Sequence, residues 1–301
     1  MLLGVCVLSS HNFFSYSMKI SFCALFALTG STSISIPVRF DRNGSPVANA
    51  SISGTCIPMR VHMFDTIAVD HSAVLLGDVQ VLTNEDPLAL IDSRITFFGG
   101  VGRESLLGVG LNSFIRNEYG PIALTRNALI LNTSVEEFVS GCRADSYMAL
   151  PINGPDAAGR WAGSVEIANV TRNVTFQLGG YVGRFISFPS DVSGDIVSRL
   201  IDNGAVELRR SISARERELV YTNCTNPFEG LPEVQITFNG IGAIVFLPED
   251  YIYYDQSVHE CYLRFMPPAR MGGFYFINPL ELPGTHIRLS NDLLEICDPI
   301  E

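Results

Sequence analysis

The sequence has few charged residues and almost no lysine. Charged residues make up 17% of its 301 positions, against roughly 25% in an ordinary globular protein, and Lys19 is the only lysine. Mechanisms that need a catalytic lysine, such as a Schiff base or a phosphate-loop lysine, are therefore excluded after that position. With 31 acidic against 20 basic side chains the net charge is −11, so the basic surface that nucleic-acid binding requires is missing. We expect no nucleic-acid partner.

Long apolar runs are also missing. No segment approaches the about 20 apolar residues that a membrane-spanning helix needs, so no membrane span is expected. Near the amino end, Lys19 precedes a short apolar run at residues 20–28 and small residues at 30–33. This order is typical of a secretory signal peptide, which we predict at residues 1–33, with translation starting at Met1 or Met18. A buried amino-terminal strand is the alternative interpretation.

The cysteine pattern does not suggest a metal centre. No C-x-x-C pair occurs, and His259 is the only histidine close to a cysteine, so we expect no metal site and no cofactor. Secretion favours disulfides, and an odd number of cysteines remains after the signal. These cysteines are Cys56, Cys142, Cys224, Cys261 and Cys297. Six N-x-S/T sequences predict glycosylation at Asn43, Asn49, Asn132, Asn169, Asn173 and Asn223.

From about residue 34 onward the sequence predicts short β-strands separated by turn residues at intervals of about 8 to 12 residues. This pattern is typical of an all-β sandwich or barrel. Residues 36–40 and 46–52 flank Asn43 and Gly44, and this Asn-Gly pair predicts a first hairpin. One helix is predicted after Pro189, with Ser190 as its cap and Gly204 at its end. Its apolar stripe consists of Val192, Ile196, Val197, Leu200 and Ile201.

The most informative stretch is residues 231–252. It reads as two alternating strands joined by a turn and closed by a proline corner, and Cys224 and Cys261 flank it. In this form it resembles the carboxyl-terminal lobe of pepsin-like aspartic peptidases, where a cysteine precedes L-P-x-(I/V)-x-F and its partner follows L-x-P-x-D-Y. Residues 104–111 resemble the family's D-G-I-L-G-L-G segment, and Trp161 with Val165 resembles its W-x-V strand. Residues 185–192 resemble the L-P-x-x-V helix start that follows the second catalytic loop.

The resemblance implies a bilobal pepsin-like double β-barrel with few short helices. The amino-terminal lobe is expected at residues 34–132 and the carboxyl-terminal lobe at 133–301. It implies a disulfide between Cys224 and Cys261. The pairing of Cys56, Cys142 and Cys297 stays open, with Cys142 to Cys297 as one possibility because the start of the second lobe and the final strand share a sheet in this fold. The family's flap hairpin has no counterpart, because Tyr119-Gly120, the only such pair, follows the L-L-G-V-G segment when a flap should precede it.

The family's chemistry needs one D-(S/T)-G-(S/T) loop per lobe, because two carboxylates about 3 Å apart share a proton and activate water. Alignment on residues 52–55 puts Ile52 at the first aspartate position, and counting back from Pro189 puts Gly180 at the second. The resemblance therefore implies an inactive homologue. A peptide or protein ligand is then expected in the interlobe cleft, at an apolar site formed by Ile52, Ser53, Gly54, Thr55, Tyr181 and Val182. The alternative is that the cleft has closed over Ile52.

Three other aspartates were weighed as replacements. Asp65 follows Phe64 and imitates F-D-T, but Ile67 replaces the glycine; Asp41 and Asp191 occupy a hairpin tip and a helix start. All three are interpreted as solvated carboxylates. Two other functions stay open: an active aspartic endopeptidase whose dyad lies elsewhere, and a secreted structural glycoprotein without a cleft function. The sequence makes no statement about the oligomeric state.

Overall fold

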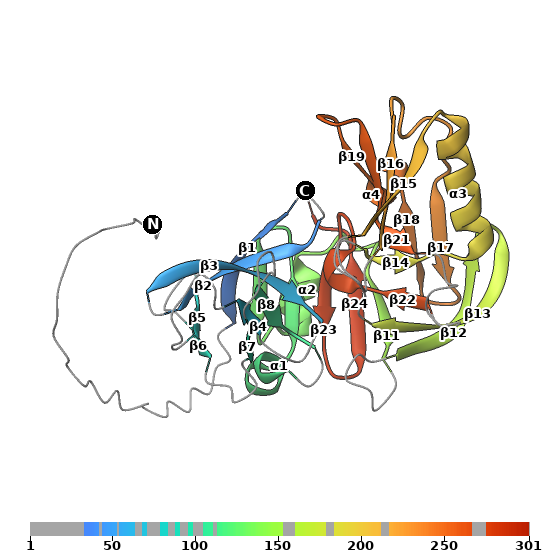
Figure 1. Cartoon of the computed structure of the whole chain (residues 1–301). Helices are drawn as coiled ribbons and strands as arrows, with labels where there is room; N and C mark the ends of the chain where they lie inside the picture. Colours follow the sequence, from blue (N-terminus) through green and yellow to red (C-terminus); the bar gives the residue numbers. More distant parts are fainter. Residues whose placement is uncertain are drawn as a thin grey trace, which may run out of the picture.

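In the computed structural model, strands are the predominant secondary structure of the described residues (Figure 1). The structure describes residues 33–41, 44–52, 54–63, 68–70, 79–83, 88–90, 96–98, 105–110, 113–152, 160–178, 184–211, 217–266 and 275–300. The expected all-β, bilobal fold is confirmed, with α-helices limited to short segments. These are α1 (Phe114–Tyr119), α2 (Val135–Ser140), α3 (Ser190–Asp202) and α4 (Pro248–Tyr251), with a 3-10 turn η2 (Pro279–Glu281).

The largest sheet joins the amino-terminal strands to the end of the chain. Its path runs β11-β24-β23-β9-β10-β1-β2-β3-β8-β4-β7, and β5 and β6 attach beside β2. The strands from the amino-terminal part are β1 (Ile34–Phe40), β2 (Pro46–Ile52), β3 (Thr55–His62), β4 (Ala68–Asp70), β5 (Val79–Val81), β6 (Leu88–Leu90), β7 (Thr96–Phe98), β8 (Ser105–Gly108), β9 (Ile122–Leu124) and β10 (Ala128–Leu131). The others are β11 (Met148–Pro151), β23 (His286–Leu289) and β24 (Leu293–Cys297).

Two further sheets form the second lobe. One has the order β18-β17-β12-β13-β22-β14-β21 and the other β15-β16-β20-β19. Their strands are β12 (Arg160–Ile167), β13 (Val170–Leu178), β14 (Ile186–Ser187), β15 (Val206–Ser211), β16 (Arg217–Thr222), β17 (Val234–Phe238), β18 (Gly242–Phe246), β19 (Ile252–Asp255), β20 (Glu260–Leu263), β21 (Phe265–Met266) and β22 (Tyr275–Ile277). In Figure 1 the red strands β23 and β24 lie between the blue and green first lobe and the yellow and orange second lobe.

The predicted first hairpin is present. Phe40 pairs with Pro46, and Gly44 adopts a φ of +78°, which an L side chain rarely tolerates. The loop is closed by Asp41, whose carboxylate accepts the Ser45 N–H at 3.0 Å. The predicted strand pair of residues 231–252 is also present, as β17 and β18 followed by α4 at Pro248.

The predicted helix is α3, with one correction at its start. Pro189 occupies the N-cap position without a side-chain hydrogen bond, so Ser190 is the first helical residue and not the cap. At the other end Gly204 has a φ of +91°, and the N–H of Ala205 donates to the carbonyl of Leu200 at 3.0 Å, as in a Schellman motif. Val192, Ile196 and Leu200 are buried, whereas Ile201 at the edge of the predicted stripe is exposed.

Candidate functional site

The two lobes repeat one arrangement of three strands. In the first lobe β3 runs parallel to β8, and the next strand, β4, pairs with β8 in the antiparallel sense and with β7 in parallel. In the second lobe β13 runs parallel to β22, and the next strand, β14, pairs antiparallel with β22 and parallel with β21. In each lobe, therefore, a loop connects two strands that lie on opposite sides of one central strand. The central strand is β8 in the first lobe, between β3 and β4, and β22 in the second, between β13 and β14.

These two equivalent loops differ in whether they contain an acidic residue. In the first lobe the chain leaves β3 at His62 and returns at Ala68 through the sequence Met-Phe-Asp-Thr-Ile, in which the aspartate is Asp65. In the second lobe it leaves β13 at Leu178 and returns at Ile186 through Gly-Gly-Tyr-Val-Gly-Arg-Phe, which contains no carboxylate. Residues 64–67 and 179–183 lie outside the described residues. Whatever path the second loop follows, it cannot supply an acid.

The predicted site residues around Ile52 lie in a different kind of connection. Ile52 ends β2 and pairs with Thr55 at the start of the antiparallel strand β3, and Gly54 turns the chain with a φ of +81°. Gly54 and Thr55 are exposed at this hairpin tip. Ser53 and the side chain of Ile52 lie outside the description, as do Gly180, Tyr181 and Val182. The expected meeting of Ile52 with Tyr181 therefore stays a prediction.

Two of the three alternative aspartates have structural partners. Asp41 forms an ion pair with Arg60 besides closing the first hairpin, and Asp191 in the first turn of α3 forms a pair with Arg172. Asp191 keeps an exposed side chain, as the interpretation of a solvated helix-start carboxylate expects. Asp41 differs from that expectation, because its side chain is only 21% exposed beside the buried Arg60. Asp65 lies outside the described residues.

A buried histidine lies immediately before the first-lobe loop. His62 is the last residue of β3, and its carbonyl accepts the N–H of Val109 at 2.8 Å. Burial, with a contribution from the nearby Arg60 guanidinium, lowers the pKa of His62 to about 4. The imidazole is therefore neutral at pH 7 and adds no charge to the base of this loop.

The second-lobe loop ends beside a buried amide that sequence reasoning missed. Asn278 follows β22 directly and is 1% exposed, and its N–H donates to the carbonyl of Phe185 at 2.7 Å. Its Oδ1 has no hydrogen-bond partner among the described residues. Only the sheet register brings Asn278 to the end of this loop, so its sequence position carried no signal.

The lobes are also joined by buried polar contacts. The hydroxyl of Ser45 in the first lobe donates to Glu281 at 2.7 Å. Arg264 packs against Gly44, where an added Cβ would lie 2.2 Å from its guanidinium, and it donates to the carbonyl of Glu281 at 3.3 Å. Burial lowers the pKa of Arg264, while Glu281, Asp250 and Asp41 act in the opposite direction.

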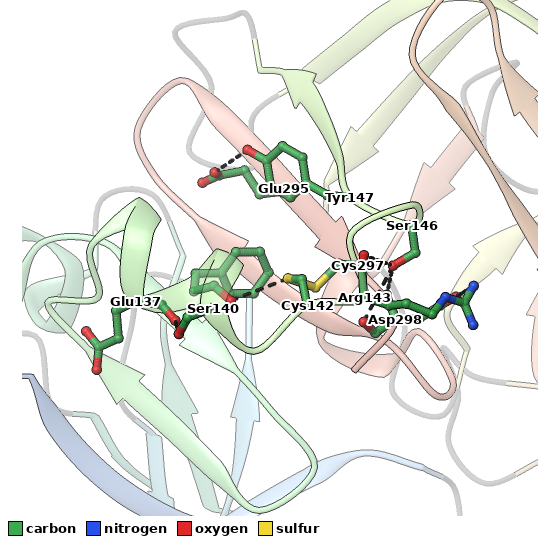
Figure 2. The surroundings of a disulfide bond; sticks show 10 residues. Glu137, Ser140, Cys142, Arg143, Ser146, Tyr147, Glu295, Cys297 and Asp298 are labelled. Atoms are coloured by element: carbon green, nitrogen blue, oxygen red, sulfur yellow. Dashed lines mark hydrogen bonds and ion pairs between the residues drawn. A yellow bond between two sulfur atoms is a disulfide. The ribbon is translucent and has the colours of Figure 1, made fainter. Parts of the chain in front are cut away.

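The expected disulfide between Cys224 and Cys261 is present, and Cys142 pairs with Cys297, a pairing that the sequence left open. The Cα atoms of Cys224 and Cys261 are 6.1 Å apart, and those of Cys142 and Cys297 are 5.6 Å apart, inside the ordinary range. Figure 2 shows the second bond, with Arg143 and Asp298 beside it. Cys56 lies exposed in β3, outside both bonds.

Four of the predicted glycosylation sites are exposed: Asn49, Asn169, Asn173 and Asn223. Asn132 is half-buried, and Asn43 lies outside the described residues. Glycan attachment stays a prediction at all six. No helix among the described residues is long and apolar enough to span a membrane. Nor does the described part of the chain bring together three His, Cys, Asp or Glu side chains around a metal position.

Comparison with known proteins identifies the fold alone. No protein-family model and no curated protein matches the sequence. Among solved structures, the chain is similar to the crystal structure of aspartic proteinase from Irpex lacteus, with a TM-score of 0.58. The match covers 89% of this chain and 98% of that chain at 13% sequence identity. The fold is therefore that of the pepsin-like aspartic proteinases, and activity has to be argued from the loops.

Proposed function

We propose that this chain is a catalytically inactive relative of the aspartic peptidases that binds a peptide or protein ligand between its lobes. The observation that carries the proposal is the acid-free sequence of the second-lobe loop, residues 179–185. A shared-proton dyad needs one carboxylate from each of two equivalent loops, and a glycine at position 180 supplies none.

The repeated strand arrangement changes which residue we place at the position of the first catalytic aspartate. The loop between β2 and β3, with Ile52 at its start, joins two antiparallel neighbours, whereas residues 63–67 join strands in the same way as residues 179–185 do. We therefore assign the first position to the segment that contains Asp65 and not to Ile52. One carboxylate then remains of two, and a single carboxylate cannot act as both acid and base.

The test is an assay of the purified mature protein on denatured protein substrates between about pH 3 and 6, where a dyad would act. The aspartic proteinase from Irpex lacteus serves as the positive control. We expect no cleavage by the wild type, by Asp65→Asn or by Gly180→Asp, because Tyr181 and Val182 also replace the residues that shape an active loop. Cleavage that Asp65→Asn abolishes would instead establish an active endopeptidase.

Ligand binding is tested in a separate experiment. A negative result there would contradict the proposed binding without contradicting the proposed lack of catalytic activity. The probe is a fluorescent octapeptide with leucine and phenylalanine at its centre, measured by anisotropy against a matched peptide with two central serines. An apolar site predicts that only the first peptide binds and that Tyr181→Ala weakens it. Absence of binding up to about 1 mM, a weak affinity by any standard, would leave a structural role as the remaining function.

Secretion belongs to the same proposal and is supported by the two disulfides, since such bonds form in oxidising compartments. Expression in a eukaryotic secretory host should yield a protein in the medium whose amino terminus lies near residue 34. Treatment with an N-glycosidase should lower its mass. Retention of residues 1–33 in a cytosolic product would contradict the signal peptide.

A further inference from the structure

A hollow of about 560 Å³ opens where four separate segments meet at one end of the neighbouring strands β10, β9, β23 and β24, in the sheet that both lobes share. Arg126 comes from the turn between β9 and β10, Arg143 from the segment after α2, and Gly284 from the turn before β23. Asp298, Pro299 and Ile300, which follow β24, complete its lining. The feature lies outside the two equivalent loops, so it is independent of the proposed function.

The two arginines of the hollow are in different electrostatic states. Arg143 donates to Asp145 at 2.8 Å and to Asp298 at 2.7 Å, so its charge is fully engaged by two carboxylates, and Figure 2 shows it beside Asp298. Arg126 is exposed and forms no ion pair with any residue that the structure describes. In a chain with a net charge of −11, an uncompensated guanidinium facing a hollow is a position for an anion.

Among the described residues that line the hollow, the guanidiniums of Arg126 and Arg143 meet one carboxylate, that of Asp298, which leaves one positive charge. Burial, with a contribution from Arg126 itself, lowers the pKa of His286 in the adjacent strand β23, so this imidazole is neutral at pH 7. Asp298 and Asp145 are engaged with Arg143. A carboxylate arriving at Arg126 therefore meets one free cation and no uncommitted acid among the described residues that line the hollow.

Pro299 and Ile300 form an apolar part of the lining of the hollow, and backbone hydrogen bonds hold their segment in place. Pro299 forms a β-bridge with Cys142, and the N–H of Ile300 donates to the carbonyl of Gly141 at 3.1 Å. The Ile300 side chain nevertheless stays 61% exposed. At Gly284 an added Cβ would meet nothing within 4 Å, so this side of the hollow is open to a ligand.

We propose that the hollow binds an amphipathic carboxylate, whose anionic end pairs with Arg126 while its apolar part covers Pro299 and Ile300. The ligand class includes the free carboxyl terminus of a peptide that ends in an aliphatic residue, and small aliphatic acids of similar length. A guanidinium binds a carboxylate through two parallel N–H donors, which gives the contact its direction.

The experiment is a titration of the full mature protein, followed by NMR chemical-shift changes in labelled protein. The probes are N-acetyl-leucine, hexanoate and the neutral N-acetyl-leucinamide, and because one exposed ion pair contributes little, we expect dissociation constants of about 1 to 10 mM for the acids. Shifts should concentrate at Arg126, Gly284 and Ile300. Tighter binding of N-acetyl-leucine than of hexanoate would identify a peptide terminus as the source, and the reverse would identify a small acid.

Two variants test the two halves of the site. Arg126→Gln should weaken the binding of both acids about threefold to fivefold, and Arg126→Lys should restore part of the loss. Ile300→Ser should weaken it about threefold. Arg199→Gln is the matched control, because Arg199 is a similarly exposed arginine on α3 that is paired with Asp195. Equal shifts with the amide, or binding that survives Arg126→Gln, would overturn the proposal. Acid binding seen only in Glu301→Gln would also overturn it, by identifying the side-chain carboxylate of Glu301 as the occupant.

Discussion

The hydroxyl of Ser45 donates a hydrogen bond to Glu281 across the junction of the lobes, over a separation of 236 residues. Both residues are buried, at 0% and 2% exposure, so water cannot replace the donor when it is removed. Ser45→Ala should lower the free energy of unfolding by about 1 to 3 kcal/mol, because the buried carboxyl group of Glu281 then loses this hydrogen bond.

Urea unfolding measures this effect, and Ser257→Ala is the matched control. Ser257 also donates its hydroxyl to a carboxylate, that of Asp255 at 2.6 Å, but on the exposed surface. The control should change stability by less than about 0.5 kcal/mol. Equal effects of the two substitutions would show that the interlobe contact adds nothing beyond a surface hydrogen bond.

Two glycines of the second lobe should respond to alanine in opposite directions. A Cβ at Gly163 would lie 2.5 Å from the ring of Trp161, which packs edge-on against Phe238 at 5.1 Å. Gly163→Ala should therefore cost about 1 to 3 kcal/mol and change the fluorescence of Trp161, the only tryptophan. Gly194 lies exposed within α3 with nothing near its Cβ position, so Gly194→Ala should stabilise by about 1 kcal/mol.

Thermal and urea unfolding, followed by fluorescence, distinguish these outcomes. A neutral Gly163→Ala would mean that the Trp161 ring can move aside, and the close contact would then be of no energetic consequence.

His62 should make stability depend on pH. Its pKa is about 6.5 in the unfolded chain and about 4 in the folded one, so the unfolded state binds more protons between these values. The stabilising contribution is complete above about pH 6.5 and is lost as the pH falls toward 4, by up to roughly 3 kcal/mol.

Unfolding free energies at several pH values between about 4 and 7 measure this slope in wild type and in His62→Gln. The variant should show a shallower dependence. His286→Gln is the comparison, because His286 is only half-buried and its pKa is lowered in the same direction. If the His62 variant keeps the full wild-type slope, other groups carry the pH dependence.

The two disulfides should differ in how much they stabilise the fold. Cys142 and Cys297 are 155 residues apart, whereas Cys224 and Cys261 are 37 apart. All four cysteines are buried, so replacement by alanine removes similar packing. In the chain-entropy model, the double Cys→Ala variant of the longer loop should be less stable by about 1 kcal/mol than that of the shorter one. Chemical unfolding of both variants tests this, and a reversed order would contradict the entropic account.

The sequence determined the features that depend on neighbours along the chain. Turn glycines such as Gly44 and Gly204, the strands on either side of Asn239-Gly240 and the apolar stripe of α3 could all be predicted, because residue type and periodicity fix local conformation. The pairing of Cys224 with Cys261 followed from the family motif around it. The start of α3 was off by one position, since a proline held the N-cap place that Ser190 was expected to fill.

The tertiary structure decided which segments are equivalent across the lobes. Residues 52–55 imitate the remainder of a catalytic motif in sequence, yet they close a simple antiparallel hairpin. The repeated arrangement favours residues 63–67, because β3 pairs in parallel with β8, more than 40 residues later along the chain. That pairing, the buried end of β22 at Asn278 and the meeting of Arg126 with Ile300 depend on sheet register between distant strands. A local pattern does not encode this register, because it is set only when the strands assemble and bury their shared core.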